Sequence, residues 1–159
     1  MNEARLLPLT ENNLHLLLER AVADADPLEV MPPVPGTTGW DPTARAAFLE
    51  FHRSRSVATP RPVESTYVIV VDEQIVGAAR LEPLDEGRVE VGAWIGRSRR
   101  GGGIGAAIMD QLLTLARDSG ARQLVACTTA ANRAACRLLD RAGADLTVTG
   151  PEVGAVAEL

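Results

Sequence analysis

The sequence predicts an α/β protein (α+β in some schemes) with a mixed central sheet of about six or seven strands and helices on both faces. Three strand-like segments follow one another in the middle of the chain, Tyr67–Val71, Ile75–Leu81 and Arg88–Ile95, as in an antiparallel meander. Both faces of the first two segments are largely apolar, so layers should cover the sheet on both sides. The pattern then changes to helix, strand and helix, which implies a parallel crossover.

The part of the chain before the meander predicts a short strand and two helices. Residues Arg5 to Leu9 form a candidate first strand, and Thr10 then resembles the N-cap of a helix with apolar residues at helical spacing. The stretch from Asp24 to Gly39 is rich in proline and glycine, so we expect no regular structure there. Asp41 followed by proline predicts the start of a second helix, which would run to around Arg55.

The part after the meander predicts two helices and three strands. An amphipathic helix carries Ile104, Ile108, Leu112 and Leu115 and ends before Gly120. A short strand at Gln123–Cys127 follows, and then a second helix with Ala135, Leu138, Leu139 and Ala142, stopped at Gly143. Leu146–Thr149 and Ala155–Leu159 would form a closing strand pair.

Composition excludes several classes of protein. The 159 residues predict one domain spanning 1–159, with 46% hydrophobic and 23% charged residues. A net charge of −5 disfavours nucleic acid as a partner. All 16 basic residues are arginine, so lysine Schiff-base chemistry and a phosphate-loop lysine are absent. No apolar run reaches the ~20 residues of a membrane helix and no signal peptide is evident, so we expect no membrane partner and a cytoplasmic protein.

The two cysteines, Cys127 and Cys136, are too few and wrongly spaced for a zinc cage, and we expect them to be small buried apolar residues. No metal site is therefore expected. The sequence leaves the oligomeric state open, with a homodimer as one alternative.

The most informative segment runs from Arg100 to Ala106, at the end of a strand and the start of a helix, and contains four glycines. Glycines allow the backbone to approach a ligand, and the first turn of a helix presents unpaired N–H groups and a partial positive charge. Together these predict an anion site suited to a pyrophosphate. A flexible surface loop is the structural alternative. A dinucleotide fingerprint is disfavoured, because no acid follows the next strand, at Cys127–Ala130.

The segment Arg100-Gly101-Gly102-Gly103-Ile104-Gly105 resembles the Gln/Arg-x-x-Gly-x-Gly/Ala motif of the GCN5-related N-acetyltransferase (GNAT) superfamily. A second segment, Asn132-x-x-Ala135-x-x-Leu138 followed by Ala142-Gly143-Ala144, resembles another motif of that family. The order of elements agrees along almost the whole chain. This resemblance implies acetyl-CoA as the donor, with no metal.

The resemblance also implies which residues hold acetyl-CoA. The backbone around Ile95 would pair with the pantetheine arm, and Asn132 would contact the arm from the other side, although Asn132 also suits a helix N-cap. The pyrophosphate would be held by the Arg100 guanidinium and by the main-chain N–H groups of Gly101, Gly103, Gly105 and Ala106.

Glu90 is the candidate catalytic base. Alternation along its strand places it on one face with Gly92 and Trp94, and similar enzymes often have a glutamate at this place. It would need burial to become an effective base, and its alternative is an exposed glutamate paired with Arg80 or Arg88. The family's usual general acid is a tyrosine where this chain has Leu139, so the acid is not identified.

The resulting hypothesis is an N-acetyltransferase that moves an acetyl group to a primary amine, either a small cationic amine or a protein or peptide N-terminus. Trp40 and the acids Asp24, Asp26, Glu29 and Asp41 could recognise a cation, or could solvate a loop while Trp40 packs on the second helix. A non-catalytic acyl-CoA-binding module and a structural domain that kept only the fold are the other two classes.

Overall fold

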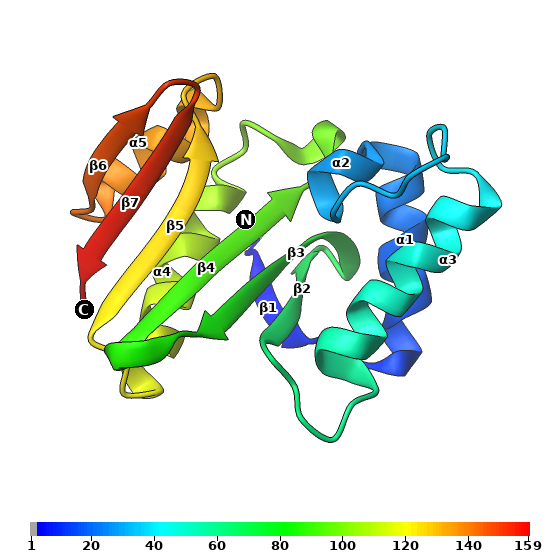
Figure 1. The fold of residues 1–159 in the computed structure, drawn as a ribbon, viewed down its shortest axis with the longest axis horizontal. Helices are drawn as coiled ribbons and strands as arrows, with labels where there is room; N and C mark the ends of the chain where they lie inside the picture. The colour runs from blue at the N-terminus through cyan, green and yellow to red at the C-terminus, as the bar shows by residue number, and fades with distance from the viewer. Residues whose placement is uncertain (1–2) are drawn as a thin grey trace.

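The computed structural model describes residues 3–159 and contains one seven-stranded mixed sheet (Figure 1). Its strand order is β1-β2-β3-β4-β5-β7-β6, and every neighbouring pair is antiparallel except β4 and β5. The predicted mixed sheet and its central meander are thus confirmed. The strands are β1 (Arg5–Pro8), β2 (Ser65–Val71), β3 (Gln74–Pro83), β4 (Arg88–Ile95), β5 (Gln123–Thr129), β6 (Asp145–Thr149) and β7 (Glu152–Glu158).

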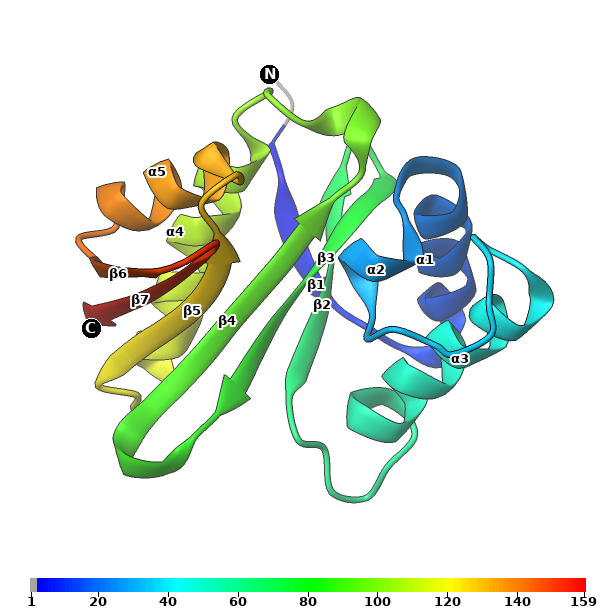
Figure 2. The ribbon, with the colours of Figure 1, turned by 45° about the horizontal axis from the view of Figure 1, so that its top comes forward.

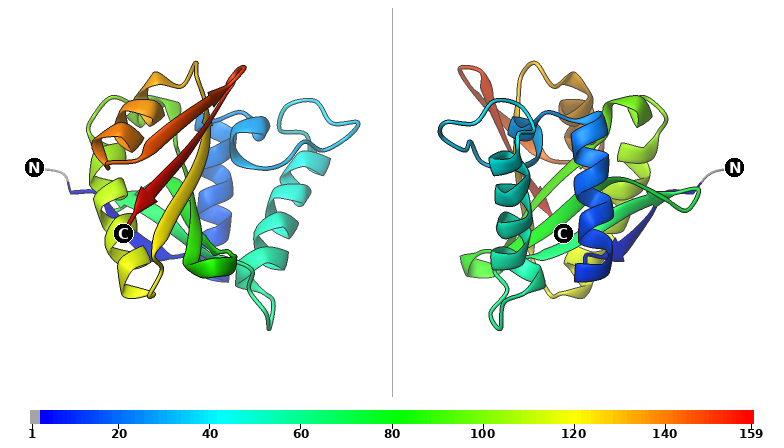
Figure 3. Two further views of the ribbon diagram at one scale, coloured as in Figure 1. Left: turned by 60° about the vertical axis from the view of Figure 1, so that its left-hand side comes forward. Right: turned by 90° about the vertical axis from the view of Figure 1, so that its right-hand side faces the viewer.

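Helices cover both faces of the sheet, as the apolar character of β2 and β3 predicts (Figure 2 and Figure 3). The helices α1, α2 and α3 lie on one side, and α4 and α5 on the other. The α-helices are α1 (Glu11–Asp24), α2 (Pro27–Val30), α3 (Pro42–His52), α4 (Ile104–Asp118) and α5 (Arg133–Arg141). A π-helical turn, η1 (Arg53–Val57), continues α3, and single turns of 3-10 helix occur at η2 (Asp85–Gly87) and η3 (Arg97–Arg99).

The hydrophobic core has two parts, one on each face of the sheet. Successive residues of β2 alternate between them: Val68 packs with Leu14 and Phe48 of the α1 and α3 layer, whereas Ile69 packs with Leu112 of α4. All five of these side chains are at most 1% exposed. This two-sided burial explains why β2 reads as a nearly continuous apolar run.

The helix starts follow the predicted capping residues. The Thr10 side chain accepts from Asn13 N–H at the start of α1, and Asp41 Oδ1 accepts from Ala44 N–H at 2.8 Å at the start of α3. Each cap satisfies a helix N–H that has no partner inside the helix.

The second helix agrees with its predicted end around Arg55, because α3 ends at His52 and continues as the π-helical turn η1 to Val57. Two local predictions were wrong. The segment from Asp24 to Gly39 contains the one-turn helix α2, whose first residue is Pro27 and whose start is held by a hydrogen bond from Asp26 N–H to Glu29 Oε1 at 3.2 Å. Cys127 is exposed and Cys136 is half-buried, so neither is a buried core residue.

The sheet opens between β4 and β5, which positions the site described below. β4 pairs with β3 up to Ile95, but its parallel pairing with β5 ends where Glu90 lies opposite Val125. Beyond this pair the two strands separate, as Figure 1 shows. The facing edges of the two strands therefore carry main-chain groups without a ladder partner. Within residues 3–159, no helix is both long and apolar enough to cross a membrane.

Candidate active site

A cavity of about 660 Å³ lies in the opening between β4 and β5. Its walls come from the end of β4, the first turns of α4, the end of β5 and the start of α5. Four of the residues predicted to bind acetyl-CoA line it: Ile95, Arg100, Gly105 and Asn132. The structure thus brings together residues that are 37 positions apart in the chain.

The glycine turn leads from β4 into α4, and two of its glycines have left-handed backbone conformations. Gly101 and Gly103 have φ values of 82° and 84°, which side-chain-bearing residues rarely adopt. No atom of another segment lies within 4 Å of the position that a Cβ would take on either glycine, so a ligand can approach the backbone there. The main-chain N–H groups of Gly101, Gly103, Gly105 and Ala106 donate to no acceptor within residues 3–159.

Gly105 lies where α4 and α5 approach each other. A Cβ on Gly105 would come within 2.9 Å of Leu138 Cδ1 on α5, the end of a flexible side chain that can move aside. Gly101 and Gly103, by contrast, need glycine for their backbone conformation.

Arginines of the turn are held by acids of α2 and its N-cap. Arg100 forms an ion pair with Glu29 of α2 and donates from Nε to Ile95 O at 2.9 Å. Arg97 pairs with Asp26 and with Glu29, whose Oε1 is 2.7 Å from Arg97 Nη2. Burial works against ionisation of Glu29, but hydrogen bonds, first of all from Arg100, hold the pKa of Glu29 below its usual value.

The acids of the segment between α1 and α3 are engaged within the protein, although Glu29 also lines both cavities. Asp24 accepts hydrogen bonds from the N–H and the hydroxyl of Ser98, at 3.0 and 2.6 Å, and Asp41 caps α3. Trp40 packs edge-on against Phe48 and donates from Nε1 to Ala25 O at 2.8 Å. The contacts therefore support the alternative in which Trp40 packs on the second helix, α3.

A second cavity, of about 310 Å³, lies on the other face of the sheet, beside α2 and the end of α3. It shares five lining residues with the first cavity, so the two meet at the end of β4. The shared residues are Leu28, Glu29, Gly92, Ala93 and Trp94. A ligand in one cavity can therefore contact a ligand in the other around Gly92–Trp94.

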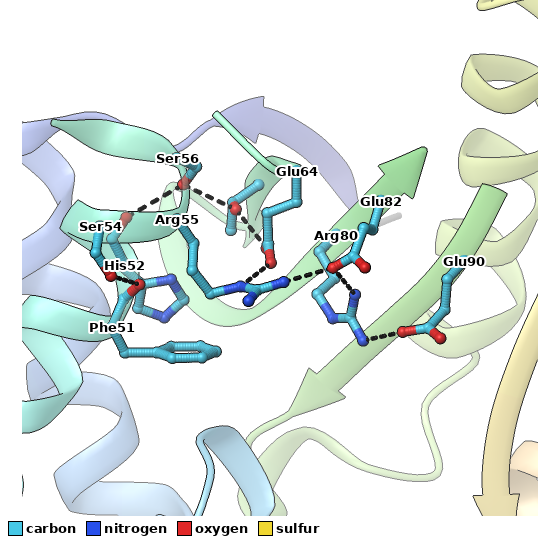
Figure 4. Close-up of polar contacts among 10 residues, drawn as sticks. Phe51, His52, Ser54, Arg55, Ser56, Glu64, Arg80, Glu82 and Glu90 are labelled. Carbon is cyan, nitrogen blue, oxygen red and sulfur yellow. Dashed lines mark hydrogen bonds and ion pairs between the residues drawn. The ribbon is translucent and has the colours of Figure 1, made fainter. Parts of the chain in front are cut away.

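Five charged side chains alternate in sign along the sheet beside the second cavity (Figure 4). We call them the charge ladder: Glu64, Arg55, Glu82, Arg80 and Glu90, in spatial order. Arg55 Nε is 2.6 Å from Glu64 Oε1 and Arg55 Nη2 pairs with Glu82, while Arg80 Nη2 is 2.5 Å from Glu90 Oε1. Three carboxylates face two guanidiniums, which gives the ladder a net charge of −1.

His52 lines the second cavity as a neutral imidazole. It is 4% exposed, packs edge-on against Phe48 and Phe51, and has no hydrogen-bond partner for either ring nitrogen within residues 3–159. Burial lowers the pKa of His52 to about 4, with Glu64 acting in the opposite direction. The sequence contained a signal for this position, since Ala44, Phe48 and His52 recur every four residues on the buried face of α3.

Comparison with known proteins identifies the family. The chain matches the model of the acetyltransferase (GNAT) family over residues 31–144. It belongs to this family. No curated protein matches the chain.

Solved structures share the GNAT fold across the whole chain. Mycobacterium smegmatis RimJ in complex with CoA-disulfide matches with a TM-score of 0.75 and 19% identity, covering 98% of this chain and 81% of that chain. RimL, a ribosomal alpha-N-protein acetyltransferase in complex with coenzyme A, matches with a TM-score of 0.74 and 15% identity, covering 99% and 94%. Campylobacter jejuni N-acetyltransferase PseH in complex with acetyl coenzyme A matches with a TM-score of 0.66 and 15% identity, covering 98% of each chain.

Within this GNAT fold, the remaining predicted residues have the following surroundings. Asn132 Oδ1 accepts from Ala135 N–H at 3.1 Å as the N-cap of α5. This contact uses only the oxygen of the side-chain amide, so the Nδ2 group is available to donate to a ligand. Leu139, at the family's usual tyrosine position, is 3% exposed and lines the first cavity. Glu90 lies where β4 and β5 begin to separate, its side chain is 31% exposed and paired with Arg80, and it lines neither cavity.

Proposed function

We propose that this GNAT acetyltransferase moves an acetyl group from acetyl-CoA to a primary amine by direct attack in a ternary complex. The observation that carries the proposal is the junction of two cavities at Gly92–Trp94. One cavity begins at an anion-binding helix start, and the other reaches the same strand end from the opposite face. Such an arrangement brings an amine and a thioester together, which supplies much of the rate enhancement of a two-substrate reaction.

The residues of the glycine turn fit the pyrophosphate of coenzyme A. The unpartnered N–H groups of Gly101, Gly103 and Gly105 lie at or just before the start of α4, where the helix dipole also favours an anion. The Arg100 guanidinium would add a charge-assisted hydrogen bond after exchanging its contact with Glu29 for the pyrophosphate.

The open edge of β4 fits the pantetheine arm. Gly96 N–H donates to Val76 O of β3 at 2.8 Å, and main-chain groups alternate along a strand, so the N–H of Ile95 points to the opposite edge, into the opening, where Ile95 O already accepts from Arg100 Nε. Asn132 Nδ2 would contact the arm from the α5 side. Acetyl-CoA supplies the activated acetyl group, and these residues bind and orient it.

The proton chemistry follows from the substrates. Attack requires a neutral amine, and deprotonating an α-amine of pKa ~8 at pH 7 costs ~1.4 kcal/mol, against ~4.6 kcal/mol for a lysine-like amine. Glu90 would receive that proton, through a water molecule because it lines neither cavity. The leaving thiol has a pKa near ~8.5, so it can depart as a thiolate beside the apolar Leu139.

A non-catalytic acyl-CoA-binding module is the second candidate function, and Leu139 in place of a tyrosine favours it. Thermal melting with acetyl-CoA tests binding, since ligand at ~100 times its Kd stabilises the folded state by ~2.7 kcal/mol. The matched variant Arg100→Ala should give a smaller shift. Thiol release with a panel of amines then tests transfer. No melting shift would contradict both functions, and a shift without thiol release from any amine would favour the binding module.

A further inference from the structure

One charged side chain, that of Glu29, stands where the two cavities meet. Of the five residues that line both cavities, Glu29 alone carries a charge, and the others are Leu28, Gly92, Ala93 and Trp94. In the proposed function an amine meets the thioester at this junction, and an amine of pKa ~8 or above is mostly protonated at pH 7. The Glu29 side chain is 29% exposed, so an ammonium group can reach its carboxylate.

Both oxygens of Glu29 have protein partners in this structure. Oε1 accepts from Arg97 Nη2 at 2.7 Å and from Asp26 N–H at 3.2 Å, and Oε2 accepts from Arg100 Nη2. Arg97 also pairs with the carboxylate of Asp26. Two carboxylates and two guanidiniums thus form a group without net charge, which attracts a cation only weakly.

The side chain of Arg100 also occupies a position that the coenzyme would need. Its Nε donates to Ile95 O at 2.9 Å, in the opening where the pantetheine arm would pair with β4. The guanidinium is a rigid plane, so a movement that takes Nε from Ile95 O also takes Nη2 from Glu29. An arm that lies along Ile95 and a pyrophosphate that binds the guanidinium would therefore both release Glu29 Oε2.

The released carboxylate would stay in place and gain attraction for a cation. Asp26 N–H and Arg97 still hold Oε1, so only Oε2 becomes free. With Arg100 on the pyrophosphate, the carboxylates of Asp26 and Glu29 face the single guanidinium of Arg97, which leaves a net charge of −1. A protonated amine at the junction can then form an ion pair with Oε2 that Arg100 otherwise prevents.

We propose that Glu29 binds the ammonium group of the amine substrate and couples the two cavities, because the coenzyme takes Arg100 away from it. This inference rests on the proposed acetyltransferase function and adds to it a substrate-binding residue and a coupling between the two substrates. The Arg100–Glu29 ion pair keeps the affinity for the amine low until the coenzyme is bound. Coupling between two sites is reciprocal, so the amine should strengthen coenzyme binding by the same factor.

Calorimetry with two matched probes tests the coupling without turnover. Phenethylamine carries an ammonium group at neutral pH, 2-phenylethanol has the same skeleton without a charge, and the second cavity offers the apolar Val30, Met31 and Phe51 to the phenyl ring. In the wild type, saturating coenzyme A should tighten binding of phenethylamine about fivefold or more and leave that of 2-phenylethanol unchanged. Phenethylamine that binds equally with and without coenzyme A, or that fails to bind the coenzyme A complex, would overturn the inference.

Two variants locate the coupling in this ion pair. Arg100→Ala should bind phenethylamine without coenzyme A about as tightly as the wild type does with it, because Glu29 Oε2 is already released. Glu29→Gln should show no coupling. The controls are Arg99→Ala, which removes a donor to Gln74 Oε1 at 2.9 Å, and Glu19→Gln, which changes an exposed glutamate of α1, and both should behave as the wild type. Full coupling in Glu29→Gln, or unchanged amine affinity in Arg100→Ala, would overturn the assignment.

Titration of coenzyme A separates this inference from the proposed function. Saturating phenethylamine should tighten coenzyme A binding by the same factor in the wild type and have no effect in Glu29→Gln. Equal coenzyme A affinity of the wild type with and without the amine would overturn the inference and leave the acetyltransferase proposal intact. Failure of the wild-type protein to bind coenzyme A at all would overturn the proposed function itself.

Discussion

Replacing His52 tests the electrostatic description of the second cavity. The imidazole is 4% exposed and neutral, and its pKa in the folded protein is about 4 against an ordinary value of 6.5. As the pH falls, the unfolded chain therefore takes up a proton before the folded protein does. The contribution of neutral His52 to the free energy of unfolding is fully present above about pH 6.5 and is lost progressively as the pH falls toward about 4.

The magnitude follows from these two pKa values. Between about pH 7.5 and about pH 5, the linkage relation gives a loss of about 2 kcal/mol in the free energy of unfolding from His52 alone. In His52→Phe this loss should be absent, because the ring keeps the edge-on contacts with Phe48 and Phe51 but has no proton to bind. At neutral pH the variant should be at least as stable as the wild type, since it buries no unpartnered ring nitrogens.

Urea denaturation at the two pH values measures both effects. At each pH, the free energy of unfolding of the variant is subtracted from that of the wild type, so contributions from the carboxylates cancel. His52→Gln provides a second variant without a titrating side chain, in case the phenylalanine ring disturbs folding. Like His52→Phe, it should lack the loss of about 2 kcal/mol on going to the lower pH. The reasoning is refuted when both variants show the same pH dependence as the wild type, or when the wild type gains stability at the lower pH.

Three further changes test the first cavity and the catalytic proposal. Glu90→Gln should lower kcat about 100-fold or more while leaving the calorimetric affinity for coenzyme A nearly unchanged; equal kcat values across the pH range would remove Glu90 from the mechanism. Glu29→Gln should free Arg100 and tighten coenzyme A binding by up to about fivefold, the range expected for an exposed ion pair; weaker binding would contradict the exchange of partners. Gly105→Ala should change the free energy of unfolding by less than about 1 kcal/mol, because the contact is with the end of the flexible Leu138 side chain and alanine favours the helix by a similar amount; a larger loss in chemical denaturation would show that Leu138 cannot move aside.

Local sequence signals predicted the helix starts well. Thr10, Asp41 and Asn132 each accept a hydrogen bond from an N–H two or three residues further along, a contact that depends on neighbouring residues only. The meander was also predictable, because short turns join its strands. The same local logic identified the glycine turn, whose backbone conformation is set by Gly101 and Gly103.

Long-range contacts between charged groups could not be predicted in this way. Arg100 and Glu29 are 71 residues apart, so nothing in the local pattern distinguishes an acid that binds a substrate amine from one that pairs with an arginine of the turn. The alternation within β4 correctly placed Glu90 opposite the α4 face, but its burial depended on Arg80 and Glu82 of the neighbouring strand. Such contacts arise from sheet register, which the sequence specifies only through the packing of both faces.

One property of β4 connects the two halves of the site. Its full pairing with β3 fixes Arg80 over Gly92, and its short pairing with β5 leaves the other edge open from Val91 onward. Strands rise about 3.3 Å per residue, so an arm that pairs along β4 from Ile95 reaches Gly92 after about 10 Å. The helix α4 begins nine residues after β4 ends, so the same strand links the anion-binding helix start to the junction of the two cavities at Gly92. In the proposed function, the placement of the coenzyme and that of the amine therefore both depend on β4, and a shift in its register would disturb both together.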